Sequence, residues 1–223
     1  MKKYPSILLL PILFTIISCD IENIINDLQD GKITAKEKLE EVMNKAKSDF
    51  AQDAVVASIY GREVSTSGEI DLLNTDSFNA FVYVVQSNSL QANEFYIPVF
   101  GSEPIKSPVN FETMLSFIKD SSAKDIMGTV LGTLAGVAID PSANYSDSPE
   151  ALNLLLPRND VKTFRTANQN SKIDMFLFPG KSIDSTSIIN SADWIINFYG
   201  DTSSLVLWLH PGNSSGTIDL LSD

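Results

Sequence analysis

Few residues of this chain are of a type that could carry catalysis, since it has one histidine, His210, and one cysteine, Cys19. Residues 212–216 (Gly-Asn-Ser-Ser-Gly) match the pattern of a nucleophilic serine turn, which needs a helix behind it and a histidine later in the chain. Here the histidine comes earlier and a strand-like segment follows, so the motif predicts a β-turn, with His210 at a strand edge. Residues 116–119 (Ser-Phe-Ile-Lys) lack the partner motifs of a Ser-x-x-Lys enzyme. We therefore predict no catalytic residue, although two of the 28 acidic residues could still serve a hydrolase.

Metal-binding patterns are equally weak. One cysteine and one histidine cannot build a zinc site from those two residue types. Residues 26–37 resemble an EF-hand calcium loop, with glycine at the sixth position, isoleucine at the eighth and glutamate at the twelfth. Leu28 stands at the third position, where an oxygen ligand is needed, and Asn26 replaces the first aspartate. The segment therefore predicts a turn that leads into a helix, and we expect neither a metal nor a cofactor.

Cys19 has a clearer chemical context. Two lysines are followed by an apolar run at residues 7–17, and Ile16-Ile17-Ser18 leads directly into the cysteine. This order resembles the lipobox of bacterial lipoproteins, in which the cysteine thiolate accepts a diacylglyceryl group. Eleven apolar residues are too few for a helix across a bilayer, which needs about 20. The resemblance implies a signal peptide at 1–18 and a lipid on Cys19; an uncleaved anchor is the alternative.

The charge balance limits the possible partners. The chain has 16 basic and 28 acidic residues, a net charge of −12, and loss of the signal would leave it near −14. Such a surface repels nucleic-acid backbones and anionic headgroups, so we expect no nucleic acid, and membrane attachment only through the lipid. The expected location is the cell envelope, with the membrane and the leaflet left open.

The hydrophobic pattern predicts an α+β fold. Thr34 and Glu37 have the spacing of a capping box ahead of a helix at 35–48. Strands are expected at three places in the first half and four in the second, with an edge position for the strand that contains Pro98. The expected strands are 54–60, 78–85, 94–100, 173–178, 193–199, 204–210 and 216–220. In the second half Pro149 marks a helix start, Pro157 ends that helix, and Asn159 begins another.

The two halves repeat the same order of elements. We therefore predict two tandem units, each a helix followed by an antiparallel β-meander, with a helical insert between them. The expected boundaries are a signal at 1–18, a lipidated tether at 19–33, a first unit at 34–107, an insert at 108–147 and a second unit at 148–223. Residues 126–139 of the insert are apolar, with glycines at every fourth position. They are too short to span a bilayer, so a buried helix is expected, with an exposed contact site as the alternative.

A weak family resemblance accompanies the repeat. Residues 61–67 (Gly-Arg-Glu-Val-Ser-Thr-Ser) and 180–186 (Gly-Lys-Ser-Ile-Asp-Ser-Thr) share glycine, a basic residue, an aliphatic residue and hydroxyls. With the strands around them, they resemble PepSY-like units, and the tandem order is similar to that of β-lactamase inhibitor proteins. The resemblance covers about 34–100 and 148–220 and implies a non-enzymatic inhibitor or modulator. The insert departs from the family pattern.

Aromatic side chains are frequent on the expected strands. If each strand buries one side only, about half of them are exposed and can bind a partner. The candidate interaction face is formed by Phe81, Tyr83, Tyr96, Trp194 and Trp208. The first functional hypothesis is therefore a lipid-anchored, non-enzymatic protein that binds an envelope or secreted protein through this face. The alternatives are a lipid-tethered carrier of an apolar ligand and a carboxylate-dependent hydrolase.

Overall fold

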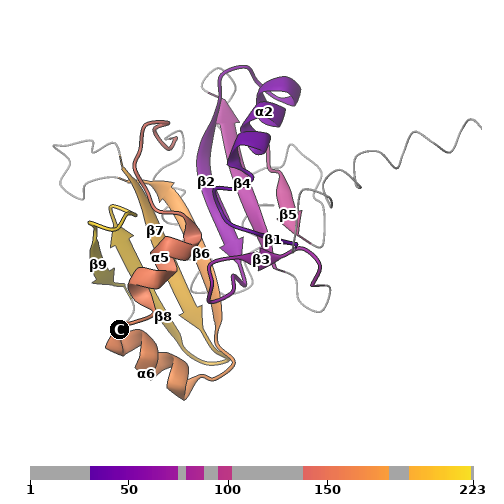
Figure 1. Ribbon diagram of the computed structural model, residues 1–223. Coiled ribbons are helices and arrows are strands. Elements are labelled where there is room, and N and C mark those ends of the chain that lie inside the picture. Colours follow the sequence, from indigo (N-terminus) through magenta and orange to yellow (C-terminus); the bar gives the residue numbers. More distant parts are fainter. Residues whose placement is uncertain (1–30, 75–78, 88–94, 102–137, 181–190, 222–223) are drawn as a thin grey trace, which may run out of the picture.

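The computed structural model describes residues 31–74, 79–87, 95–101, 138–180 and 191–221. The segment with Cys19, the Ser-x-x-Lys pattern and most of the insert lie outside the described residues. The described parts form one seven-stranded antiparallel sheet in the order β5-β4-β2-β6-β7-β8-β9, together with a two-stranded sheet of β1 and β3 (Figure 1). The fold is therefore mixed α+β, as the hydrophobic pattern predicts.

The bounds of most elements are close to those expected from the sequence. β5 begins at Val99 rather than at residue 94, and the short strands β1 and β3 were not predicted. The helices are α2 (Leu39–Asp49), α5 (Ser148–Leu155) and α6 (Asn159–Ala167). The strands are β1 (Lys32–Ile33), β2 (Ala54–Arg62), β3 (Ile70–Asp71), β4 (Ala80–Ser87), β5 (Val99–Gly101), β6 (Lys172–Pro179), β7 (Ala192–Tyr199), β8 (Ser204–His210) and β9 (Thr217–Leu220). β5, which follows Pro98, and β9 lie at the two edges of the large sheet, and the position of β5 agrees with the edge strand that Pro98 predicts.

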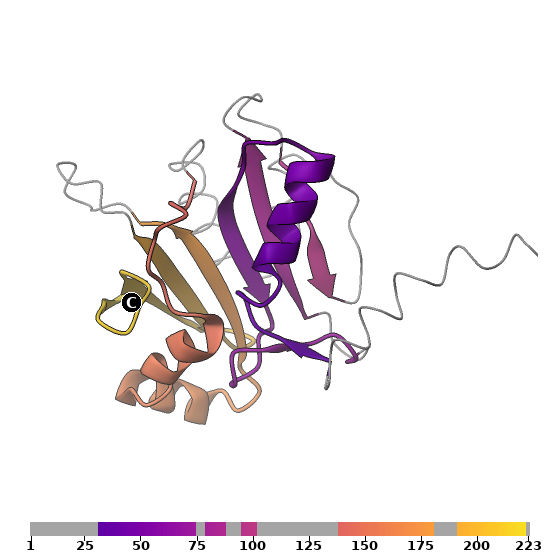
Figure 2. The ribbon, with the colours of Figure 1, turned by 45° about the horizontal axis from the view of Figure 1, so that its top comes forward.

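All three described helices lie on the same face of the large sheet, α2 over β2 and β4, and α5 and α6 over the β6–β8 half (Figure 2). Strand residues that point to this first face form the larger core cluster with the helices, and alternate residues form a second cluster on the opposite face. In β4, for example, Phe81 and Tyr83 belong to the first cluster, whereas Val82 and Val84 belong to the second. Both faces are therefore buried, which explains the nearly uninterrupted apolar runs of the strands.

The first helix begins later than the capping box predicts. Residues 35–38 form turns, and α2 begins at Leu39 without a side-chain cap. Only half of the box forms, since the Glu37 carboxylate accepts the backbone N–H of Thr34 at 3.2 Å. The Thr34 hydroxyl instead donates to Asp147, 113 residues away, at 2.5 Å. A carboxylate brought in by the tertiary fold thus replaces the local backbone amide as its partner.

Asp147 and Ser148 join the two halves of the chain. Asp147 caps α5 through the Ser148 N–H and also accepts the N–H of Lys36 at 2.9 Å. The Ser148 hydroxyl donates to the Gly68 carbonyl at 2.6 Å and accepts the N–H of Ala35. Gly68 has φ +83°, and a Cβ on it would lie 2.4 Å from the Pro149 backbone, so the helix start lies directly against this turn.

The end of the insert returns to the sheet beside a β-bulge. The register of β2 shifts between Val56 and Ser58, where Ala57 is the extra residue. The Val56 carbonyl accepts the N–H of Ile139 at 2.8 Å, and the Ile139 side chain is buried. Residues 139–145 then run across the sheet toward α5. The predicted helix at 126–139 otherwise lies outside the described residues.

Candidate functional site

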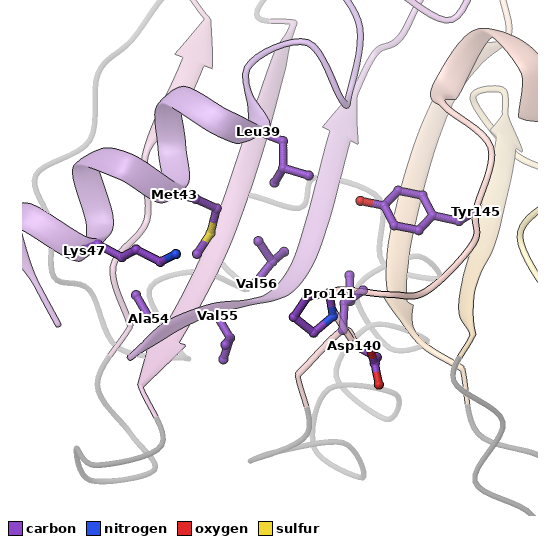
Figure 3. A pocket seen from close by; sticks show the side chains of 10 residues that line it. Leu39, Met43, Lys47, Ala54, Val55, Val56, Asp140, Pro141 and Tyr145 are labelled. Carbon is purple, nitrogen blue, oxygen red and sulfur yellow. The ribbon is translucent and has the colours of Figure 1, made fainter. Parts of the chain in front are cut away.

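A half-open pocket of about 300 Å³ lies between α2, the start of β2 and the segment 139–145 (Figure 3). Most of its lining is apolar. α2 supplies Leu39, Met43 and Lys47; β2 supplies Ala54, Val55 and Val56; and the returning segment supplies Ile139, Asp140, Pro141 and Tyr145.

The helical repeat explains the first wall of the pocket. Leu39, Met43 and Lys47 are four residues apart, so they follow one stripe along α2. The neighbouring stripe, with Val42 and Ala46, is fully buried against the sheet. The helix therefore uses one stripe for the core and the adjacent one for the pocket. Met43 is suited to this position because its flexible thioether adapts to irregular apolar surfaces.

Two polar groups face the pocket from opposite sides. The Tyr145 hydroxyl points from the returning segment toward α2, and the Lys47 side chain extends along the helix toward the same space (Figure 3). Among the described residues, Tyr145 uses its ring and its carbonyl to contact Lys36, while its hydroxyl makes no hydrogen bond. Burial, with the nearby charge of Asp147, raises the pKa of Tyr145 to about 12, so the hydroxyl is a neutral donor at physiological pH.

Asp140 contributes less to the interior of the pocket. Its carboxylate accepts the backbone N–H of Ser142 at 2.7 Å and the Ser142 hydroxyl at 2.6 Å. These bonds lower its pKa, and the carboxylate points away from Met43 and Tyr145 (Figure 3). The pocket therefore combines an apolar interior with one cation and one hydroxyl donor on its walls.

The best acid–base geometry in the described chain is the contact between Asp193 and His210 on the second face of the sheet. The buried Asp193 carboxylate contacts Nδ1 of His210 and accepts the indole N–H of Trp208 at 3.2 Å. Burial raises the pKa of Asp193, and the histidine partly opposes this effect. The nearest nucleophile candidate, Ser191, has its hydroxyl 3.5 Å from the aspartate rather than on the imidazole. This arrangement orients His210 without activating a described serine.

Asp174 forms the second buried polar cluster. Its carboxylate is almost fully buried and accepts the Tyr60 hydroxyl and the Glu63 N–H, both at 2.9 Å. Tyr199 approaches the same carboxylate at 3.4 Å. Desolvation outweighs these favourable bonds and raises the pKa of Asp174 to about 6. The cluster joins β2, β6 and β7.

The aromatic interaction face predicted from the sequence is wrong for four of its five residues. Phe81, Tyr83 and Trp194 are fully buried under the helices, and Tyr96 is 9% exposed. Only Trp208 is partly exposed, and it lies on the opposite face. The error has a physical cause: the strands were expected to bury one side, whereas the sheet is buried on both sides.

The other motifs are clearer. Residues 212–216 form the turn between β8 and β9, where Asn213 Oδ1 accepts the N–H and the hydroxyl of Ser215, so the predicted β-turn is confirmed. His210 is the last residue of β8, as predicted, although its contact with Asp193 could not be foreseen. Residues 31–37 of the EF-hand-like segment are described: Gly31 directly precedes β1, and Glu37 lies in the turn before α2. In the described residues, no group of three or more His, Cys, Asp or Glu side chains could hold a metal ion.

Sequence reasoning missed the pocket residues because most of them resemble ordinary core positions. The one available signal was Lys47, a lysine on the otherwise apolar stripe of α2. Within the part of the chain that the structure describes, no helix is long and apolar enough to cross a membrane. No family model matches the chain, and the curated proteins and solved structures contain no match either.

Proposed function

We propose that this protein is a lipid-anchored, non-enzymatic binding protein of the bacterial cell envelope, whose pocket holds the apolar part of a small ligand. The observation that supports this function best is the apolar pocket between α2, β2 and 139–145. Its volume of about 300 Å³ is at the lower end of the range for small-molecule sites, about 300–1,000 Å³. The burial of Phe81, Tyr83 and Trp194 makes the ligand carrier the stronger of the sequence-based hypotheses.

The envelope location rests on the sequence around Cys19. A lipid on this cysteine would hold an acidic, otherwise unanchored body at the membrane surface, where apolar small molecules are concentrated. The acidic charge keeps the protein itself from adhering to anionic headgroups. A tethered carrier in this position can exchange ligand with the membrane without inserting its own chain.

We also propose that the chain consists of two tandem PepSY-like units. The order of strands supports this organisation, because β2-β4-β5 and β6-β7-β8 are both antiparallel meanders that extend outward from the β2–β6 pair. In each half the meander follows at least one helix on the first face of the sheet. A pseudo-twofold relation of this kind would place the pocket in the first unit, beside the connection to the second.

Binding of a neutral fluorescent probe tests the pocket directly. The mature chain with Cys19→Ala is titrated with N-phenyl-1-naphthylamine, whose emission rises in an apolar site. Met43→Trp adds a bulky ring to the pocket wall and should weaken probe binding at least tenfold. Leu73→Trp adds the same ring at a leucine that is 64% exposed and outside the pocket, so it should bind like the parent protein.

The outcomes separate the hypotheses. Saturable binding that Met43→Trp alone abolishes supports the carrier. No binding by the parent protein, or equal binding by Met43→Trp, would overturn it. Circular dichroism and urea unfolding of both variants show whether they keep the fold.

Protein binding remains a second candidate, at a different surface. β9 is an edge strand, and Leu220 is 55% exposed. Leu221 donates its N–H to Val206, so by alternation the backbone groups of Leu220 point away from β8. An extended segment of an envelope protein could add to this edge. Leu220→Pro would block such pairing without removing a β8–β9 bond, and a pull-down from solubilised envelopes with both chains tests it.

A further inference from the structure

The second face of the large sheet is buried, although no described element lies over it. Phe176, Ile195 and Val206 point to this face from neighbouring strands and are at most 2% exposed. All members of the second core cluster belong to the strands of the large sheet or to residues 95–97. The three described helices lie on the first face, as do the apolar side chains of residues 139–145 (Figure 2). A single layer of strands cannot shield its own side chains from water, so a second layer must come from residues outside the described ranges.

We propose that residues 102–137 supply this layer, and that the apolar segment 126–137 packs against the second face of β2 and β4. The apolar segment contains no charged residue, which suits a position on buried strands. The other internal segments outside the described residues have ten residues or fewer, and the amino-terminal 30 residues hold the expected signal and tether. Residues 102–137 therefore combine sufficient length with a continuous apolar run.

The places where the chain leaves and rejoins the sheet support this path. Residues 102–137 begin directly after β5, at one edge of the sheet, and the chain returns at Ile139, whose N–H donates to the Val56 carbonyl. Val85, which lies opposite Val56, bonds through its backbone to Tyr96 on the β5 side. The Val56 carbonyl therefore points away from β4, toward β6. The chain must cross both β4 and β2 to reach it, and α2 already occupies the first face of these two strands (Figure 2).

The length of the apolar segment fits the same path. The crossing begins level with Arg62 and ends level with Val56, and β2 extends about 20 Å between these residues, at about 3.3 Å for each residue. A helix made of the twelve residues of the apolar segment would be about 18 Å long. Gly128, Gly132 and Gly136 would lie on one stripe of that helix, so its backbone could approach the sheet closely.

This packing assigns the second face to the core of the protein. It leaves the pocket between α2 and β2 and the β9 edge as the surfaces for a ligand or a partner. The pocket does not depend on it, since the second face is the opposite side of the sheet, so failure of this proposal would leave the carrier function intact.

Disulfide scanning tests the contact directly. The Cys19→Ala chain has no cysteine, so a pair can be placed in it without competition. Ser58→Cys changes one atom of a fully buried side chain beside Val84 on the second face. It is combined in turn with a cysteine at each position of the apolar segment, and the mature chain is oxidised. Because a disulfide needs Cα atoms within about 7 Å of each other, it should form at only one or two positions, three or four residues apart.

Ile59→Cys is the matched control, because Ile59 is the next residue of β2 and points to the first face. It should form no disulfide with the apolar segment. Cross-links of the segment to Ile59→Cys would overturn the proposal. A complete set of twelve pairs with Ser58→Cys that gives no cross-link would overturn it too.

Thiol labelling under native conditions tests the same contact without a cross-link. In the proposed helix Leu131 shares the side of Gly128 and Gly132, so Leu131→Glu would force a charge between the apolar segment and the sheet. It should raise the labelling rate of Ser58→Cys at least tenfold and leave that of Ile59→Cys unchanged. Thr133→Glu adds the same charge on another side of the helix and should change neither rate. An unchanged rate for Ser58→Cys, or an equal rise for both cysteines, would contradict packing on the second face.

Discussion

Asp174 provides a quantitative test of how strongly the second face of the sheet buries its polar side chains. The protein contains a carboxyl that is almost completely buried among Tyr60, Glu63 and Tyr199, and its pKa is raised from 3.8 to about 6. The folded state therefore binds this proton more tightly than the unfolded state. Its contribution to stability is fully present below pH 3.8 and is lost as the pH rises through about 6.

The magnitude follows from the size of the shift. A difference of about two pKa units corresponds to about 3 kcal/mol over the whole window, of which about 2 kcal/mol falls between pH 4.5 and 7.5. Asp174→Asn keeps the shape of the side chain and cannot ionise. The free energy of unfolding of the parent protein should therefore fall by about 2 kcal/mol relative to Asp174→Asn over this range.

Urea unfolding at both pH values, followed by the fluorescence of the buried Trp194, measures this difference. Other groups, including Asp193, titrate in both chains and cancel in the comparison. Asp219→Asn removes an exposed carboxyl from the same face and controls for net charge. Parallel pH profiles for the parent chain and Asp174→Asn would refute the reasoning, because they would mean that the carboxyl is equally solvated in both states.

Two further predictions concern the connections within the chain, and a third concerns the lipid on Cys19. Asp147→Ala should lower the free energy of unfolding by about 2 kcal/mol, because Thr34 and the start of α5 lose the same partner. Urea titration measures the change. An unchanged midpoint would contradict the idea that Asp147 holds the two halves of the chain together. Gly68→Ala should lower it by about 3 kcal/mol, since φ +83° is strained for alanine and its Cβ would meet the Pro149 backbone; thermal unfolding checks this, and a neutral effect would argue against the close approach. Radioactive palmitate should label the native protein and not Cys19→Ala, and label on both would exclude this cysteine as the lipid site.

Much of the fold could be predicted from the sequence because it depends on local patterns. The apolar runs predicted six of the seven strands of the large sheet nearly to their ends, and Pro98 indicated an edge strand. Pro149 and Pro157 marked the limits of α5, because proline fixes φ and cannot donate a hydrogen bond. The turn at residues 212–216 was predicted from the order of its neighbours alone.

The pairing of distant groups could not be predicted in this way. The Thr34 hydroxyl has a local amide available and instead donates to Asp147, so α2 begins four residues later than the capping pattern indicates. The aromatic side chains are buried because both sheet faces are covered, and a run such as that of β4 does not show which neighbour covers it. The contact of His210 with Asp193 depends on the register of two strands.

By itself, therefore, the sequence determined the approximate places of the three described helices, six strands of the large sheet, an edge strand near Pro98 and the acidic charge. All of these follow from residue type and periodicity along the chain. Only the tertiary structure decided which face of each strand met a helix, and which side chains from α2, β2 and 139–145 enclosed a common space. The physical reason is that a pocket is the space that packed side chains leave empty. Such a property belongs to the packing of segments that are about a hundred residues apart, and no local pattern records it.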